Sequence, residues 1–159
     1  MNLYGFGPAA APDQRPSAQA VEAARRQVGY DYLEFRREPP ALRKRRALYV
    51  DLSAVAKGYG VDAVSAALAK LGCPSHMVEI GGEVFAAGSK PDGAAWRIGV
   101  EVPDSVPGTA IGKVVYLRNV AVATSGDYRN YIEWDGNRYS HTFDARTGAS
   151  VAHGLASVT

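Results

Sequence analysis

The feature that most constrains the fold is one long helical pattern followed by a succession of short strand patterns. Residues 54–71 carry apolar side chains at helical spacing, and Val61, Val64, Leu68 and Leu71 are the expected buried stripe. Helical patterns and the later meander of strands occupy separate parts of the chain. The sequence therefore predicts an α+β fold, with mixed or antiparallel sheets packed against helices.

The remaining elements are shorter. An earlier helix is predicted to begin after Ser17, its expected N-cap, and to end at Gly29. The basic run 43–46 is interpreted as a solvated hairpin, with a phosphate or partner patch as the alternative. No repeat or linker divides the chain, so one domain over residues 1–159 is expected. Strands are predicted at residues 32–36, 47–52, 76–80, 83–87, 96–100, 113–117, 120–123, 131–134 and 138–143.

The composition is that of a globular domain, with 47% hydrophobic and 21% charged residues. Lys and Arg total 18 against 16 Asp and Glu, and a net charge of +2 is too small to indicate a dedicated nucleic-acid binder. No apolar run approaches the ~18 residues that a membrane span needs. The single cysteine, Cys73, excludes an internal disulfide and a cysteine-based zinc cluster.

The segment 51–60, D-L-S-A-V-A-K-G-Y-G, lies at a predicted strand-to-helix junction. The first turn of a helix has unpaired N–H groups and the positive end of the helix dipole, which favour an anion. Lys57 would add a full positive charge at that place. In the structural alternative, Ser53 only caps the helix, and Gly58 and Gly60 allow it to pack against a sheet.

Two further segments are glycine-rich or rich in small polar residues. Gly81-Gly82 lies between two predicted strands, and a tight bend or bulge is favoured there over a ligand site. Residues 123–128, A-T-S-G-D-Y, are interpreted as a polar loop after a buried strand.

Three histidines can be compared as general bases. His141 is the best candidate, because an imidazole pKa near 6.5 suits proton transfer around neutral pH. His76 is expected to be structural, and His153 is expected on the surface. If 138–143 is one extended strand, His141 shares a face with Phe143 and points away from Asp144, so the two do not form a local dyad.

Several segments together resemble one family. They are N-L-Y-G-F-G-P at the start, D-L-S-A-V-A-K-G-Y-G-V-D at 51–62, I-G-G-E at 80–83, A-T-S-G-D-Y at 123–128, S-H-T-F-D-A-R-T-G at 140–148 and the final S-V-T. In this order they resemble the FAD:protein FMN transferase family, also called ApbE. The resemblance implies an α+β fold of the ApbE type.

The resemblance also implies a reaction and its residues. Such enzymes use Mg²⁺ to split FAD at its pyrophosphate. FMN passes to a Thr or Ser hydroxyl of a target flavoprotein, and AMP leaves. By motif position, Asp51, Lys57 and Phe143 would contact FAD, and Ala54 would ligate Mg²⁺ through its backbone carbonyl. His141 would be the base that deprotonates the acceptor hydroxyl.

The sequence departs from the family pattern in places. Ala145 replaces a usual proline, and Phe143 replaces a usual aliphatic residue. An earlier A-M-D-like flavin motif and a later Asp/Thr metal motif are not among these residues. We therefore expect the central part of a longer domain, incomplete at both ends, with residues 3–6 and the strand at 157–159 left uncovered.

Other readings of the same residues stay open. The alternatives are an FAD pyrophosphatase that forms FMN and AMP, a flavin-binding module without catalysis, and an inactive truncated fragment. The location in the cell is also open. A typical family member would be periplasmic or a membrane-anchored lipoprotein.

Overall fold

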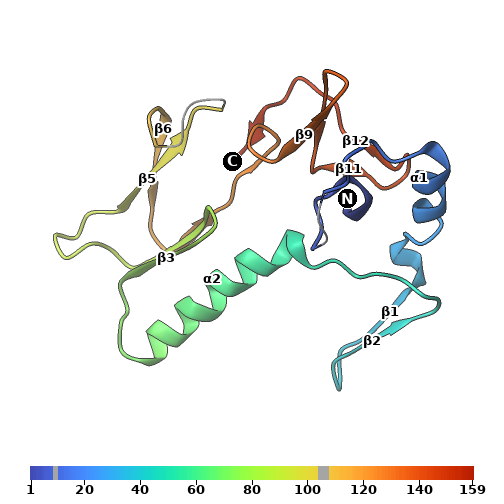
Figure 1. Cartoon of the computed structure of the whole chain (residues 1–159). Helices are drawn as coiled ribbons and strands as arrows, with labels where there is room; N and C mark the ends of the chain where they lie inside the picture. The colour runs from blue at the N-terminus through green and yellow to red at the C-terminus, as the bar shows by residue number, and fades with distance from the viewer. Residues whose placement is uncertain (9–10, 104–107) are drawn as a thin grey trace. The chain divides into compact units, whose positions relative to one another are not determined.

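The computed structural model describes residues 1–8, 11–103 and 108–159 (Figure 1). Its two α-helices and antiparallel strand pairs confirm the predicted α+β class. The chain divides into two compact units. Unit 1 comprises Met1–Val50 and Arg129–Gly154, and unit 2 comprises Asp51–Tyr128 and Leu155–Thr159. Neither described helix is long and apolar enough to span a membrane.

Unit 1 combines one short helix with three two-stranded antiparallel ribbons, in which β1 pairs with β2, β9 with β10 and β11 with β12. Its elements are η1 (Asn2–Tyr4), α1 (Ala18–Arg25), η2 (Tyr30–Tyr32), β1 (Leu33–Arg36), β2 (Ala41–Lys44), β9 (Tyr131–Trp134), β10 (Asn137–Ser140), β11 (Phe143–Asp144) and β12 (Ala149–Ser150).

Both ends of α1 have a local cause. Ser17 is its N-cap, as predicted, and its Oγ accepts a hydrogen bond from the Ala20 N–H at 3.2 Å. The helix ends earlier than predicted, at Arg25 rather than near Gly29. Beyond that point the backbone bonds span three residues instead of four, as in the bond from Val28 N–H to the Arg25 carbonyl.

The basic segment lies on the β1–β2 hairpin, whose strands are mostly solvent-exposed, as the hairpin interpretation predicted. Its arginines are partly neutralised within the hairpin. Arg45 Nε donates to Glu34 at 2.6 Å, and Arg43 lies 3.7 Å from the same carboxylate.

The core of unit 1 is aromatic and forms around Tyr4. This side chain is 5% exposed, and its ring centre lies 4.7 Å from that of Phe143 and 5.9 Å from that of Trp134. The expectation that residues 3–6 are left uncovered is therefore wrong for Tyr4, although Leu3 is exposed. Burial of an aromatic ring among other rings explains why the chain folds back onto β9 to β11 here.

Unit 2 contains the long helix and three antiparallel sheets, ordered β3-β4-β7, β5-β6 and β13-β8. Its elements are α2 (Ser53–Lys70), β3 (His76–Ile80), β4 (Glu83–Ala87), β5 (Trp96–Glu101), β6 (Ile111–Leu117), β7 (Val120–Val122), β8 (Ser125–Gly126) and β13 (Ser157–Val158).

The helix α2 packs against β3 and β4 (Figure 1). Val61 is buried, as predicted, but Val64 and Leu71 are exposed, so the predicted stripe is wrong at these two positions. Apolar residues occur on every side of this helix, and their spacing alone does not select the packed face. Ser65 takes a buried position instead, and its hydroxyl lies 2.7 Å from Nε2 of His76.

The core of unit 2 lies between its sheets. Val84, Ala86 and Leu117 are buried there, and Trp96, Ile98, Val115 and Val122 pack against them. At the end of the chain, β13 forms an antiparallel pair with β8, while the Val158 side chain stays exposed, as expected for this strand. The segment 123–128, expected to be a loop, therefore contains a short strand.

Two predicted strands differ in the structure. Residues 47–52 form no strand, and of their apolar side chains only Leu48 is buried. The predicted strand 138–143 is divided, since β10 ends at Ser140 and β11 begins at Phe143. The Thr142 N–H donates to the Ser140 hydroxyl at 3.2 Å, and such a side-chain bond competes with the strand ladder. His141 therefore lies in a bend.

Candidate active site

Asp51 lies two residues before the start of α2, in unit 2. Its Oδ1 accepts a hydrogen bond from the Ser53 N–H at 2.7 Å, so Asp51 satisfies a free donor of the first helical turn. Ser53 is the first helical residue and not the cap, which corrects the structural alternative. Hydrogen bonds from the Ser53 side chain and backbone hold the pKa of Asp51 below its usual range, so this exposed carboxylate is ionised at neutral pH.

Lys57 lies about one turn further along α2 and reaches the β3–β4 hairpin. Its Nζ donates to the Gly81 carbonyl at 2.9 Å and lies 2.6 Å from Oε2 of Glu83. Gly81 and Gly82 form the predicted tight bend, with φ of 57° and 94°. A two-residue hairpin loop with positive φ at both positions is a turn that glycine favours.

His141 lies in unit 1, in the bend between β10 and β11. Its Nδ1 lies 3.2 Å from the Asn130 carbonyl oxygen, which also accepts the His141 backbone N–H at 3.1 Å. A carbonyl oxygen only accepts hydrogen bonds, so Nδ1 carries the proton. Within the part of the chain that the structure describes, Nε2 has no partner, and its lone pair is available to take a proton.

His76 has the opposite environment. It is 8% exposed, and both ring nitrogens are used. Nδ1 donates to the Cys73 carbonyl at 2.8 Å, and Nε2 accepts from the Ser65 hydroxyl at 2.7 Å. No lone pair is left for catalysis, which confirms the structural role predicted for His76.

Phe143 begins β11 and is half-buried in the aromatic core of unit 1. Its ring packs on Tyr4 and lies 6.1 Å, centre to centre, from the ring of Phe6. Phe6 also approaches His141, with ring centres 6.3 Å apart. The Phe143 side chain is thus used in packing, so a contact with a nucleotide would be made by its backbone.

Asp144 does not act on His141. Its carboxylate is held by Arg146, with Nη2 to Oδ2 at 2.8 Å and Nε to Oδ1 at 3.1 Å. These hydrogen bonds hold the pKa of Asp144 below its usual range and raise that of Arg146. The prediction that His141 and Asp144 form no dyad agrees with this arrangement.

The described residues do not form a magnesium site on their own. Ala54 is the second residue of α2 and offers one backbone carbonyl. Mg²⁺ needs nearly octahedral oxygen ligation, usually with carboxylates. In the described ranges, no three His, Cys, Asp or Glu residues are grouped so that they could hold a metal ion.

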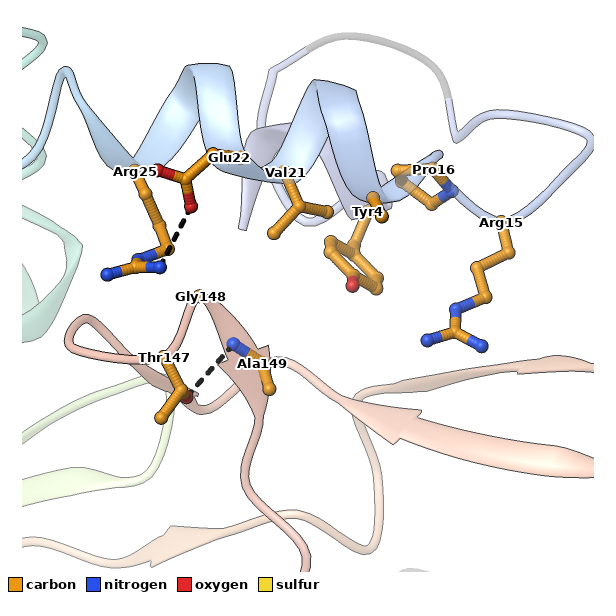
Figure 2. Close-up of a pocket in the computed structure, with 10 residues that line it drawn as sticks. Tyr4, Arg15, Pro16, Val21, Glu22, Arg25, Thr147, Gly148 and Ala149 are labelled. Carbon is orange, nitrogen blue, oxygen red and sulfur yellow. Dashed lines mark hydrogen bonds and ion pairs between the residues drawn. The ribbon is translucent and has the colours of Figure 1, made fainter.

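A cavity of about 520 Å³ in unit 1 lies between α1 and the turn at residues 147–149 (Figure 2). Gly148 lines it, and an added Cβ at this glycine would lie 2.8 Å from the Arg25 side chain. Neither His141 nor Phe143 lines this cavity. The cavity is therefore separate from the predicted base.

The sequence model of the ApbE family matches residues 1–159. The chain belongs to the ApbE family. Curated FAD:protein FMN transferases from Haemophilus influenzae and Vibrio cholerae are 41% and 45% identical to it over all of its residues. This alignment covers 47% of each relative, so the chain spans about half the length of the curated relatives that it matches.

Solved structures of ApbE proteins confirm the fold. The apo flavinyl transferase ApbE of Pseudomonas stutzeri is 45% identical, with a TM-score of 0.81 over 98% of this chain and 47% of that one. The flavin transferase ApbE of Vibrio cholerae is 41% identical, with a TM-score of 0.83. This match covers 98% of the present chain and 48% of the Vibrio chain. The ApbE protein of Thermotoga maritima is 32% identical, with a TM-score of 0.82. This match covers 98% of the present chain and 50% of the Thermotoga chain.

The site residues expected from the ApbE family lie in both units. Ala54 and Lys57 lie in the first turns of α2 in unit 2, and Asp51 precedes this helix. His141 and Phe143 lie around the start of β11 in unit 1. The α2 group combines a helix start, the Lys57 ammonium and the Asp51 carboxylate, and the β11 group combines an imidazole with an aromatic core.

Three residues that contact the candidate site residues were given no role in the sequence-based predictions. Glu83 contacts Lys57. In the sequence, this residue could have been found only as the final glutamate of the I-G-G-E motif at 80–83. Asn130 acts through its backbone carbonyl, which no side-chain pattern could reveal. Tyr4 was quoted within a motif, but its burial follows from the aromatic residues of β9 to β11.

Proposed function

We propose that this chain supplies part of the active site of an FAD:protein FMN transferase. The enzyme moves FMN from FAD to a Thr or Ser hydroxyl of a target flavoprotein and releases AMP. The observation that carries the proposal is the match of the whole chain to curated enzymes of that name, at 41% and 45% identity. The geometry of His141 and Lys57 supports it.

In the proposed reaction, the acceptor oxygen attacks the phosphorus on the FMN side of the pyrophosphate. A P–O bond forms to the acceptor, and the P–O bond to the bridging oxygen breaks. AMP leaves with that oxygen, and the acceptor proton passes to Nε2 of His141. Nothing is oxidised or reduced, and the product is a phosphoester.

His141 is suited to this proton transfer. A hydroxyl is a weak nucleophile until a base removes its proton. The Asn130 carbonyl fixes the tautomer with a basic Nε2, and it continues to accept the Nδ1–H bond when the ring becomes cationic. The imidazole therefore need not rotate during the step.

The start of α2 is suited to an anionic substrate. Its N–H groups and the Lys57 ammonium favour pyrophosphate charge, and positioned charge is the main catalytic contribution in phosphoryl transfer. Asp51 is ionised and would repel a phosphate, so we assign it to a donor group of FAD. Phe143 would contact the nucleotide through its backbone.

Magnesium dependence stays a prediction. Ala54 would offer one backbone ligand, and the described residues do not complete the coordination shell. When bound, Mg²⁺ supplies positive charge to the pyrophosphate.

The test is a transfer assay with the intact protein, FAD, Mg²⁺ and an acceptor flavoprotein of the Vibrio cholerae relative. Mass spectrometry should show the acceptor with one added FMN phosphoester, and chromatography should show one AMP for each transfer. Free FMN and AMP without a modified acceptor would contradict the transferase proposal and indicate the pyrophosphatase instead.

A further inference from the structure

The position of the Lys57 ammonium is set by two oxygens at the end of the β3–β4 hairpin. The Gly81 carbonyl accepts its hydrogen bond, and the Glu83 carboxylate lies 2.6 Å away. The two side chains come from different elements, α2 and β4. This contact therefore joins the helix start to the hairpin turn.

The shielded carboxylate of Glu83 depends on this contact for compensation of its negative charge. Its side chain is 19% exposed, and its Oε2 atom is shielded from solvent. Among the described residues, this oxygen receives no aligned hydrogen bond, although it lies at ion-pair distance from Lys57. A shielded carboxylate oxygen without a hydrogen bond is costly unless an opposite charge compensates it. Lys57 supplies that charge.

The turn is shaped to let Lys57 approach. An added Cβ on Gly81 would lie 2.9 Å from Cδ of Lys57, whereas one on Gly82 would meet nothing within 4 Å. Gly81 thus gives the lysine stem room to lie against the hairpin. The neighbouring Gly82 is required only for the positive φ of the turn, and not for the approach of Lys57.

We propose that Glu83 is a positioning residue that aims Lys57 at the pyrophosphate of FAD, an inference that rests on the proposed function. An ammonium has three N–H donors. The Gly81 carbonyl accepts one of them, and the Glu83 carboxylate holds the ammonium as an ion-pair partner, so a donor is left for a phosphoryl oxygen. Without Glu83, the flexible four-carbon stem would have to be ordered when FAD binds.

The test is a double-mutant cycle on FAD binding, followed by flavin fluorescence without acceptor, and on kcat/KM for transfer. The variants are Glu83→Gln, Lys57→Met and the two combined. Ordering one long side chain predicts a roughly 2- to 10-fold loss of FAD affinity in Glu83→Gln. In the Lys57→Met background, Glu83→Gln should have no further effect on affinity.

The controls separate charge, folding and positioning. Glu79→Gln removes the same charge from an exposed position on β3 and should leave FAD affinity unchanged. Glu83→Asp keeps the carboxylate and should restore part of the affinity. Thermal unfolding of each variant checks that the protein is folded.

Equal losses from Glu83→Gln in both backgrounds would overturn the inference, because a merely structural role acts whether or not Lys57 is present. Unchanged or tighter FAD binding in Glu83→Gln would also overturn it. Failure of the proposed function gives a different result, in which the wild-type protein itself neither binds FAD nor transfers FMN.

Discussion

The imidazole of His141 is fixed by the backbone of Asn130, whose carbonyl oxygen lies 3.2 Å from Nδ1. This one contact leaves Nε2 as a free base. His76 shows the contrast, because Ser65 and the Cys73 carbonyl use both of its nitrogens. The fold thus assigns one histidine to packing and leaves another with proton-accepting capacity.

The Ser65–His76 pair predicts a stability effect without a catalytic one. Ser65→Ala leaves the buried Nε2 of His76 without a donor, which should cost about 1–3 kcal/mol in the free energy of unfolding. Alanine has a better helix propensity than serine, which offsets roughly 0.5 kcal/mol of this loss of stability. Urea denaturation measures the change, with Ala66→Ser at an exposed position of α2 as the control. No loss of stability would show that the hydroxyl does not satisfy this nitrogen.

Tyr4 should be a main contributor to the stability of unit 1. Tyr4→Ala removes a ring that is 5% exposed and packed on three aromatic side chains, so a loss of about 3–5 kcal/mol is expected. Trp134 fluorescence, in a Trp96→Phe background, reports unfolding of this unit. Tyr30→Ala is the control, since Tyr30 is 82% exposed. Equal effects at the two tyrosines would contradict the aromatic core.

The two glycines of the β3–β4 turn should differ in their effect on FAD binding. An alanine at either position adopts positive φ, at a cost of roughly 1–2 kcal/mol. Only Gly81→Ala also displaces Lys57, so FAD affinity should fall roughly 2- to 10-fold in Gly81→Ala and stay near wild type in Gly82→Ala. Fluorescence titration measures both. A similar loss in the two variants would mean that the turn matters and the lysine position does not.

Asp51 predicts an acid-dependent contribution to stability. Its folded pKa is lowered by Ser53, so the stabilisation is complete above the unfolded value of about 3.9 and is lost as pH falls through the lower folded value. A carboxyl NMR titration should give a midpoint below about 3.9. Ser53→Ala should move that midpoint up, because the Ser53 side chain is the largest cause of the shift. An unmoved midpoint would refute this cause.

Local patterns predicted much of the fold. The bounds of β3 and β4 agree with the predicted strands, and Gly81-Gly82 forms the tight bend that was predicted between them. These predictions succeed because alternation and turn residues act over a few neighbours. The face of α2 could not be predicted in the same way, since Val64 is as apolar as Val61 and tertiary packing chooses between them.

The site was predicted less completely than the fold. The family motifs assigned roles to Lys57 and His141, which stay predictions, and the groups that hold these two side chains come from other elements. Glu83 reaches Lys57 through the β3–β4 hairpin, and Asn130 contributes a backbone oxygen. The bend at His141 depends on the Ser140 hydroxyl, which interrupts a sequence that otherwise suits a strand.

Nε2 of His141 is the proposed acceptor of the hydroxyl proton, and single-turnover FMN transfer in His141→Ala tests this role most directly. Loss of a general base predicts a rate lower by about 100-fold or more, with FAD affinity within about twofold of wild type. His153→Ala, at an exposed histidine, is the matched control and should transfer FMN at the normal rate. Transfer at the wild-type rate by folded His141→Ala protein would contradict the account.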